Sequence, residues 1–190
     1  MFTSEIGFQQ ALTGVYSLLA SRSLYGDNLT MGFASALAQN YAPTSTNSYF
    51  YSTRRYDYVS DEVRSYTSGI WSISYNAIAG ANNIIAHTES NRSALTESKY
   101  NEIRGEALAL RALLHFDLLR IFAPSVARGS GQKAIPYKTT VDQLSKIPST
   151  VSEVIDLALQ DLDQGVDLLK KSDPIQDGGT SRQIKMNYYA

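Results

Sequence analysis

Hydrophobic residues recur at steps of three and four along four stretches of the chain. These stretches cover residues 6–19, 70–85, 100–121 and 151–169. In the last of them, Val151, Val154, Ile155 and Ala158 fall on one side of a helix. Because this spacing places apolar side chains on a single helix face, it predicts four amphipathic helices.

Local signals mark the ends of the third and fourth predicted helices. Thr150 with Glu153 three residues later forms a capping box, and Thr96 followed by Glu97 suits the start of the third helix. Pro124 ends that helix, because proline cannot continue the hydrogen-bond ladder and disfavours helix at the residue before it.

Alternating apolar and polar residues never run long enough to predict a substantial sheet. The best candidate for local strand pairing is the short aromatic run Tyr49-Phe50-Tyr51. Four amphipathic helices on this spacing indicate an all-α fold of stacked helix pairs, which approximates the tetratricopeptide pattern.

Two long segments separate the helices. Residues 123–149 contain three prolines and two glycines, which predicts an inter-helix loop on the surface. The other segment is a Tyr-rich loop over residues 28–58, of which residues 28–53 carry no charged side chain. Seven of the thirteen tyrosines lie within residues 41–75.

Charge and composition restrict the function. Seventeen basic and eighteen acidic side chains leave a net charge of -1, so no general attraction to nucleic acid or anionic lipid is expected. The absence of cysteine excludes disulfides, cysteine zinc sites, iron–sulfur clusters and thiol catalysis. Because the chain also has only two histidines, we expect no catalytic residue, no metal and no cofactor. A binding role is therefore the favoured function.

The Tyr-rich loop supplies the candidate binding residues. Neutral sugars present hydroxyls and apolar C–H faces, so their sites need aromatic platforms with uncharged or bidentate polar groups. Tyr49, Tyr51, Tyr56 and Tyr58 are the candidate platforms, and Arg54 beside them could hydrogen-bond vicinal hydroxyls. The alternative interpretation is that the rings pack the loop onto the helices and that the arginine is solvated or paired.

Enzyme hypotheses have less support. A glycosidase needs two carboxylates that face each other across a bond, but Asp156, Asp161, Asp163 and Asp167 share one predicted helix. Asp156, Asp163 and Asp167 fall near one face, and a solvated helix face explains these three better. His115 has no partner at zinc-ligand spacing, and His87 is expected to close the second helix.

The second and third predicted helices carry a spaced motif of aromatic, small and charged residues. It comprises Trp71, Tyr75, Ile78, Ala81, Asn82, Ile84 and Ile85, then Gly105, Glu106, Ala107, Leu110, Arg111, Ala112, Phe116, Leu118, Ile121 and Phe122. This motif resembles that of the SusD/RagB family. Ile135-Pro136-Tyr137 and the segment from Thr150 to Leu162 are similar to the family segments that follow, so the resemblance covers nearly the whole chain in order.

The resemblance implies a non-catalytic, surface-exposed lipoprotein of the outer membrane of Bacteroidetes-type bacteria. Such proteins sit as a lid on a SusC-like TonB-dependent barrel, capture oligosaccharides or polysaccharides for import, and attach to the membrane only through a lipid anchor, here upstream of the chain. Family members are much longer, so residues 1–190 would be the N-terminal part of a SusD-like helical domain. The apolar face that Ile184, Met186 and Tyr188 begin then stops, unfinished, at Ala190.

The resemblance also implies a scaffold role for several motif residues. Gly105 would allow close helix approach, and Glu106 and Arg111 would bind buried polar partners. The family's ligand loops have no fixed motif, so the candidate tyrosines come from composition alone. The alternative function is a helical interaction module that docks on the transporter and carries a non-sugar cargo such as a peptide.

Overall fold

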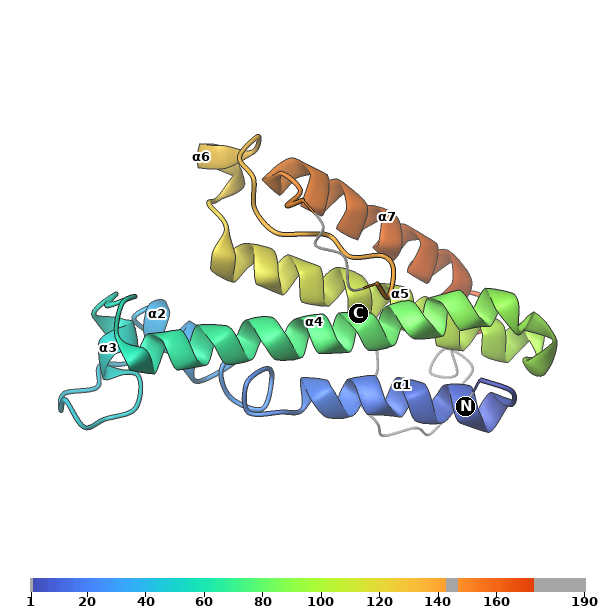
Figure 1. Cartoon of the computed structure of the whole chain (residues 1–190), viewed down its shortest axis with the longest axis horizontal. Coiled ribbons are helices and arrows are strands. Elements are labelled where there is room, and N and C mark those ends of the chain that lie inside the picture. Colours follow the sequence, from blue (N-terminus) through green and yellow to red (C-terminus); the bar gives the residue numbers. More distant parts are fainter. Residues whose placement is uncertain (1, 143–146, 173–190) are drawn as a thin grey trace. The chain divides into compact units, whose positions relative to one another are not determined.

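The computed structural model describes residues 2–142 and 147–172, and these residues are mainly helical (Figure 1). The helices are α1 (Glu5–Leu19), α2 (Phe33–Leu37), α3 (Tyr51–Arg54), α4 (Asp61–Ser90), the 3-10 helix η1 (Arg92–Ala94), α5 (Glu97–Phe122), α6 (Val126–Gly129) and α7 (Val151–Leu169). In the described part of the chain, β pairing is limited to an isolated bridge between Lys133 and Thr150. The predicted all-α class is therefore confirmed.

The chain divides into two compact units, which we describe separately. The core unit comprises residues 1–15 and 77–190, and the tyrosine unit comprises residues 16–76. Nine of the thirteen tyrosines belong to the tyrosine unit. The apolar run predicted at residues 184–189 lies outside the described residues.

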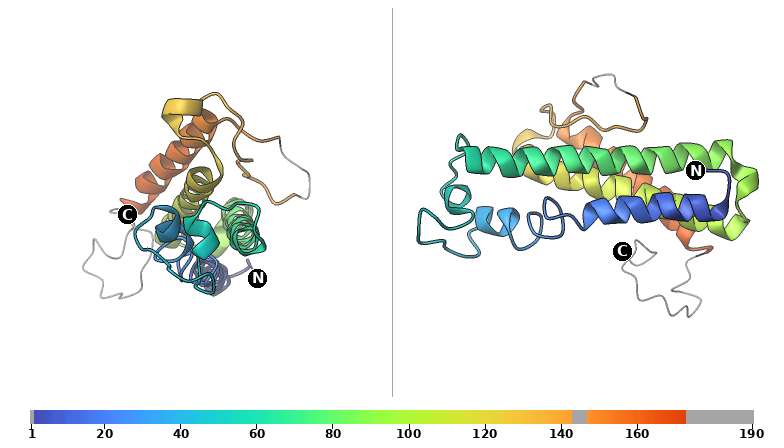
Figure 2. Two further views of the ribbon diagram at one scale, coloured as in Figure 1. Left: turned by 90° about the vertical axis from the view of Figure 1, so that its left-hand side faces the viewer. Right: turned by 60° about the horizontal axis from the view of Figure 1, so that its bottom comes forward.

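In the core unit, α7 packs against α5 at an inclination (Figure 1 and the left view of Figure 2). Two glycines allow this close approach: a Cβ added at Gly105 would lie 2.8 Å from Leu169 Cγ and 3.1 Å from the Gly165 carbonyl oxygen. Residues 105–112 of α5 are all buried, so this stretch is enclosed on every side rather than along one stripe.

The predicted caps are present. Thr150 Oγ1 accepts a hydrogen bond from Glu153 N at 3.2 Å, and Glu153 Oε2 accepts one from Thr150 N at 2.6 Å, which completes the capping box of α7. The Thr96 side chain accepts from Lys99 N at the start of α5. That helix ends at Phe122, because Ala123 before Pro124 is extended.

A buried ion pair joins α5 to α7. Arg111 donates two hydrogen bonds to the carboxylate of Asp161, at 2.7 and 2.6 Å, and a third from Nη1 to Asn82 Oδ1 of α4 at 2.9 Å. Asn82 in turn donates to the Lys138 carbonyl oxygen. Asp161 lies in the same helix as the exposed Asp156, Asp163 and Asp167, but it is itself 5% exposed.

Tyr137 and His115 extend this network to the extended segment before α7. Tyr137 is fully buried and donates to Asp161 Oδ2 at 2.6 Å. His115 stacks on the Tyr137 ring with centroids 3.8 Å apart, and its Nε2 accepts from Lys138 N at 3.0 Å. The network thus holds the 137–138 segment against α4, α5 and α7.

In the tyrosine unit, α4 begins at Asp61, nine residues before the predicted apolar stripe at Ile70. Ser60 Oγ accepts from Val63 N, and Asp61 and Glu62 place negative charge in the first turn, where the helix dipole favours it. The strand proposed at Tyr49–Tyr51 is wrong: Tyr49 and Phe50 lie in a turn, and Tyr51 starts α3.

Candidate functional site

A pocket of about 290 Å³ opens within the tyrosine unit. Six residues line it: Arg22, Ser23, Asn28, Tyr49, Ser65 and Tyr66. They come from the segment after α1, the turn before α3 and the first half of α4. Two phenol rings, two hydroxyls, an amide and a guanidinium give the pocket mixed aromatic and polar walls.

The single charged side chain that lines this pocket is already paired. Arg22 Nε donates to Asp27 Oδ2 at 3.2 Å, and its guanidinium lies 5.3 Å from the centre of the Tyr49 ring. The hydrogen bond and charge of Asp27 raise the pKa of Arg22 above its ordinary value. Arg22 is therefore a positive group with its own counter-ion and a ring beneath it.

Asn28 is buried in the wall of this pocket. It is 4% exposed, and its Oδ1 accepts no hydrogen bond from the residues that the structure describes. Its backbone is fixed, since Asn28 N donates to the Arg22 carbonyl oxygen and Asn28 O accepts from Ala34 N. A buried amide oxygen without a partner is a group that a ligand or water would satisfy.

Tyr66 forms a fixed wall. Its ring packs 4.8 Å from Phe50 and 6.1 Å from Phe33, centroid to centroid. Burial, with a smaller effect of the Glu62 charge, raises the pKa of Tyr66, so the hydroxyl remains protonated at neutral pH. It can then both donate and accept.

The structure separates the predicted site residues into three groups. Tyr49 is 70% exposed and reaches the pocket. Tyr56 and Tyr58 are 50% and 58% exposed and form a pair with ring centroids 6.4 Å apart. Tyr51 is half-buried with the Arg55 guanidinium 5.6 Å from its ring centre.

Arg54, the fifth predicted residue, lies in α3 and is half-buried. Its carbonyl oxygen accepts a hydrogen bond from Gln39 Nε2 at 2.7 Å, which joins α3 to the residue two positions after α2. Only Tyr49 of the five predicted residues is among those that line the pocket.

The segment around these tyrosines holds a strained backbone. Gln39, Phe50 and Tyr56 have φ values of 61°, 62° and 57°, in the left-handed region that is costly for side chains other than glycine. Gln39 and Phe50 are supported by the Arg54 carbonyl contact and by ring packing, respectively. Such strain, where it is well supported, is typical of ligand-binding segments.

Sequence reasoning missed five of the six residues that line the pocket: Arg22, Ser23, Asn28, Ser65 and Tyr66. Tyr66 was counted among the seven tyrosines of residues 41–75, but nothing in the local pattern distinguishes it. The other four meet only through the fold, and for them the sequence carries no signal.

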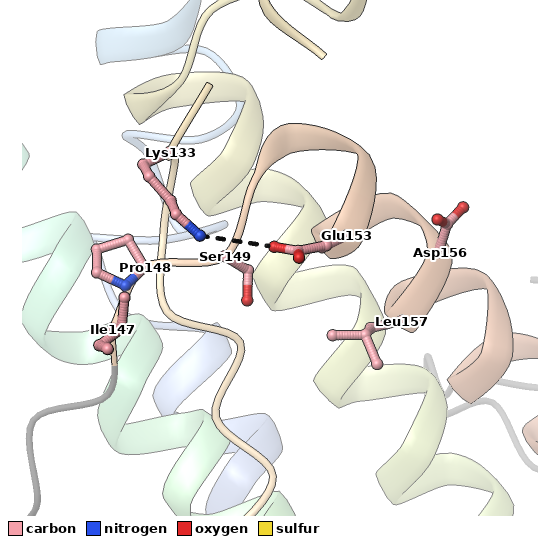
Figure 3. Close-up of a pocket in the computed structure, with 7 residues that line it drawn as sticks. All are labelled: Lys133, Ile147, Pro148, Ser149, Glu153, Asp156 and Leu157. Atoms are coloured by element: carbon pink, nitrogen blue, oxygen red, sulfur yellow. Dashed lines mark ion pairs between the residues drawn. The ribbon is translucent and has the colours of Figure 1, made fainter. Parts of the chain in front are cut away.

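A second pocket, of about 500 Å³, lies in the core unit at the start of α7 (Figure 3). Lys133 and Glu153 face each other across it at 4.0 Å, beside Ile147 and Pro148. No aromatic ring lines it, and its charged groups are the exposed Lys133, Glu153 and Asp156, beside Ser149. It offers a sugar less than the tyrosine unit does.

The acidic residues of α7 do not form a catalytic pair. Asp156, Asp163 and Asp167 are exposed, whereas Asp161 is held by Arg111. In the described residues no group of three or more histidine or acidic side chains could hold a metal ion. His87 lies in the last turn of α4, as expected, and its ring stacks on that of Phe2 with centroids 4.3 Å apart.

The sequence matches the model of a known protein family. The SusD-like family described as "Starch-binding associating with outer membrane" matches residues 1–177. The chain therefore belongs to the SusD-like family. No helix in the described residues is long and apolar enough to cross a membrane.

Solved structures of Bacteroides proteins share the fold. A SusD superfamily protein from Bacteroides thetaiotaomicron has a TM-score of 0.75 and 23% identity, with 98% of this chain and 40% of that chain covered. A SusD-like carbohydrate binding protein from Bacteroides vulgatus has a TM-score of 0.75 and 18% identity, with 97% and 39% covered. A SusD superfamily protein from the same species has a TM-score of 0.79 and 20% identity, with 98% and 40% covered.

The chain thus spans about 40% of the length of the solved structures that it matches. No curated protein sequence matches it. At these identities the likeness supports the fold, and function must be argued from the site.

Proposed function

We propose that this protein is a non-catalytic binding protein that captures an oligosaccharide or polysaccharide at the outer membrane. The observation that carries the proposal is the pocket of the tyrosine unit, where Tyr49 and Tyr66 flank a buried Asn28 whose Oδ1 lacks a partner. Aromatic rings would stack on the apolar face of a sugar, and the amide and hydroxyls would hydrogen-bond its edge.

The proposal extends to the rest of the uptake route. The captured glycan would pass to a SusC-like TonB-dependent barrel, and a lipid anchor upstream of this chain would hold the protein at the cell surface. The family description supports association with the outer membrane. The barrel and the anchor are supported by the resemblance of the motif alone.

Tyr56 and Tyr58 are the proposed second platform. Their rings are both exposed, and the two residues follow the end of α3 by two and four positions. A glycan of more than one sugar unit could therefore contact them as well as Tyr49. Tyr51 and Arg54 are proposed as their support, because each is half-buried.

Native affinity electrophoresis of the full-length protein tests the proposal. We expect retardation in gels that hold one of a panel of neutral polysaccharides, starch included, and weaker retardation for Tyr49→Ala. The matched control is Tyr100→Ala, which removes a tyrosine of the core unit that hydrogen-bonds Glu89. Retardation that is unchanged in Tyr49→Ala would place the site elsewhere. Binding of peptides in place of glycans would favour the alternative function, a helical interaction module with a non-sugar cargo.

A further inference from the structure

The charges of the tyrosine unit cancel. It contains four basic side chains, Arg22, Arg54, Arg55 and Arg64, and four acidic ones, Asp27, Asp57, Asp61 and Glu62. At the pocket the same balance is local, since Arg22 is the charged residue in its wall and Asp27 is hydrogen-bonded to it at 3.2 Å.

We propose that Asp27 is a specificity-determining residue that restricts this pocket to uncharged sugars by neutralising Arg22. The inference rests on the proposed glycan-binding function of the same pocket. An arginine in a sugar site would otherwise bind a uronate or sulfate bidentately, because its planar fork matches those anions. Here Asp27 already accepts a hydrogen bond from Arg22 Nε and supplies the counter-charge, so an incoming carboxylate would have to compete with it.

The geometry keeps Asp27 in place. Its carbonyl oxygen accepts from Gly32 N at 2.8 Å and from Thr30 Oγ1 at 3.0 Å, so the backbone at this position is held by the following turn. A Cβ at Gly32 would lie 2.5 Å from Asp27 Oδ1, which shows that the carboxylate packs directly against the Gly32 backbone. Asp27 therefore faces Arg22 from a fixed position rather than as a loose surface charge.

The carboxylate of Glu62 also disfavours an anionic sugar. Glu62 accepts from Ser52 N at 3.0 Å, and its charge contributes to keeping Tyr66 protonated. An anionic sugar beside Tyr66 would therefore meet negative charge from Glu62 as well as competition from Asp27. A neutral sugar meets neither penalty, and its hydroxyls can pair with Asn28, Ser65 and the Tyr66 hydroxyl.

The substitution Asp27→Asn isolates the charge. The amide keeps the shape of the side chain and can still accept from Arg22, but the positive charge is left without a counter-ion. The stability cost should be small, because the Arg22 side chain is 66% exposed and exposed ion pairs contribute little. We expect the ratio of affinities for acidic over neutral glycans to rise by about tenfold, the effect of one charge-assisted contact.

The matched control is Glu97→Gln. It removes one negative charge from the chain, as Asp27→Asn does, and likewise frees an arginine, Arg92, from an exposed ion pair. Glu97 belongs to the core unit, whereas the pocket residues belong to the tyrosine unit. A non-specific attraction of a less negative protein to polyanions would appear in both variants, whereas loss of the proposed restriction appears only in Asp27→Asn.

The experiment is affinity electrophoresis of the full-length protein and these variants in gels of neutral polysaccharides and of polygalacturonate. Three results together would support the inference. The wild type is retarded by a neutral glycan and not by polygalacturonate, and Asp27→Asn gains retardation by polygalacturonate. The double variant Asp27→Asn with Arg22→Gln loses that gain. Retardation of the wild type by polygalacturonate, or equal gains in Asp27→Asn and Glu97→Gln, would overturn the role of Asp27 but not the proposed glycan-binding function. If no glycan retards the wild type, the proposed function itself fails and takes the inference with it.

Discussion

Arg111 shows how one side chain organises the core unit. It is 7% exposed, and its guanidinium donates hydrogen bonds to two side chains that are also buried, those of Asp161 and Asn82. A buried charge is tolerated only when it is paired and hydrogen-bonded, and the two-point contact with Asp161 meets that condition. The role that the family resemblance implies for Arg111, that of binding buried polar partners, is thus observed.

Arg111→Ala should destabilise the protein strongly. Removing one member of a buried pair leaves Asp161 charged and without its main partner, which typically costs about 3–5 kcal/mol. Urea unfolding followed by circular dichroism measures the change. Lys133→Ala is the control, because it breaks an ion pair whose side chains are about 60% exposed, which contributes about 0–1 kcal/mol. Equal effects of the two substitutions would contradict the structural role assigned to Arg111.

At the scale of elements, the contact between α5 and α7 depends on two glycines. Gly105 and Gly165 face each other, and a Cβ on either would lie 3.1 Å from the carbonyl oxygen of the other. That contact is with backbone, so neither helix can relieve it by moving a side chain. The helices can approach this closely only because both positions lack a side chain.

Gly105→Ala should therefore lower the free energy of unfolding by about 1–3 kcal/mol, the usual cost of overpacking a core. The control is Gly14→Ala in α1, where an added Cβ meets nothing within 4 Å. There alanine should stabilise the helix by up to about 1 kcal/mol through its higher helix propensity. Thermal unfolding of both variants checks the prediction, and a stabilised Gly105→Ala protein would refute it.

Elements with local signals could be predicted from sequence, and contacts between distant segments could not. The cap of α7 and the end of α5 follow from Thr150, Glu153 and Pro124, which are neighbours of the ends that they define. The first turns of α4 were missed because their residues are mostly polar and show no stripe.

The same distinction applies to individual residues. Asp161 continues the buried spacing of Val154 and Ala158 in α7, which indicates a buried position, but its partner Arg111 lies fifty residues earlier in the chain and cannot be found from that spacing. For the candidate site, composition pointed to Tyr49, which lines the pocket of the tyrosine unit. The polar residues that surround its pocket meet only through folding.

At the scale of the whole molecule, buried tyrosines couple stability to alkaline pH. Burial is the main cause that raises the pKa of Tyr75 and of Tyr137 far above the ordinary value, and the hydrogen bond to Asp161 adds to the effect for Tyr137. The folded protein therefore retains these protons at pH values where the unfolded chain releases them.

The sign of the pH dependence follows. Below the unfolded tyrosine pKa of about 10, both states are protonated and these groups add no pH dependence. Above it, each group lowers the free energy of unfolding by about 1.4 kcal/mol per pH unit. Urea unfolding between pH 9 and 11 should show this loss, and Tyr137→Phe should reduce its slope while starting from a lower stability. An unchanged slope in that variant would contradict the assignment.

The charge of the whole chain leads to the last prediction. With a net charge of -1, and equal numbers of basic and acidic side chains in the tyrosine unit, neither long-range attraction nor a free cation at the pocket assists binding of the proposed neutral glycan. Affinity would come from ring stacking and hydrogen bonds, which salt screens little. Raising the salt from about 50 to about 500 mM, which shortens the screening length severalfold, should therefore change the dissociation constant of wild type for its glycan less than about twofold.

Isothermal titration calorimetry measures that constant at each salt concentration. The contrast is Asp27→Asn with polygalacturonate, where the freed charge of Arg22 would carry the binding, so that affinity should fall steeply as salt rises. A wild-type affinity that also fell steeply would mean that an unpaired charge contacts the ligand. The pairing of Arg22 with Asp27 would then not persist in the bound state, and the site would have to be sought among the other arginines of the tyrosine unit.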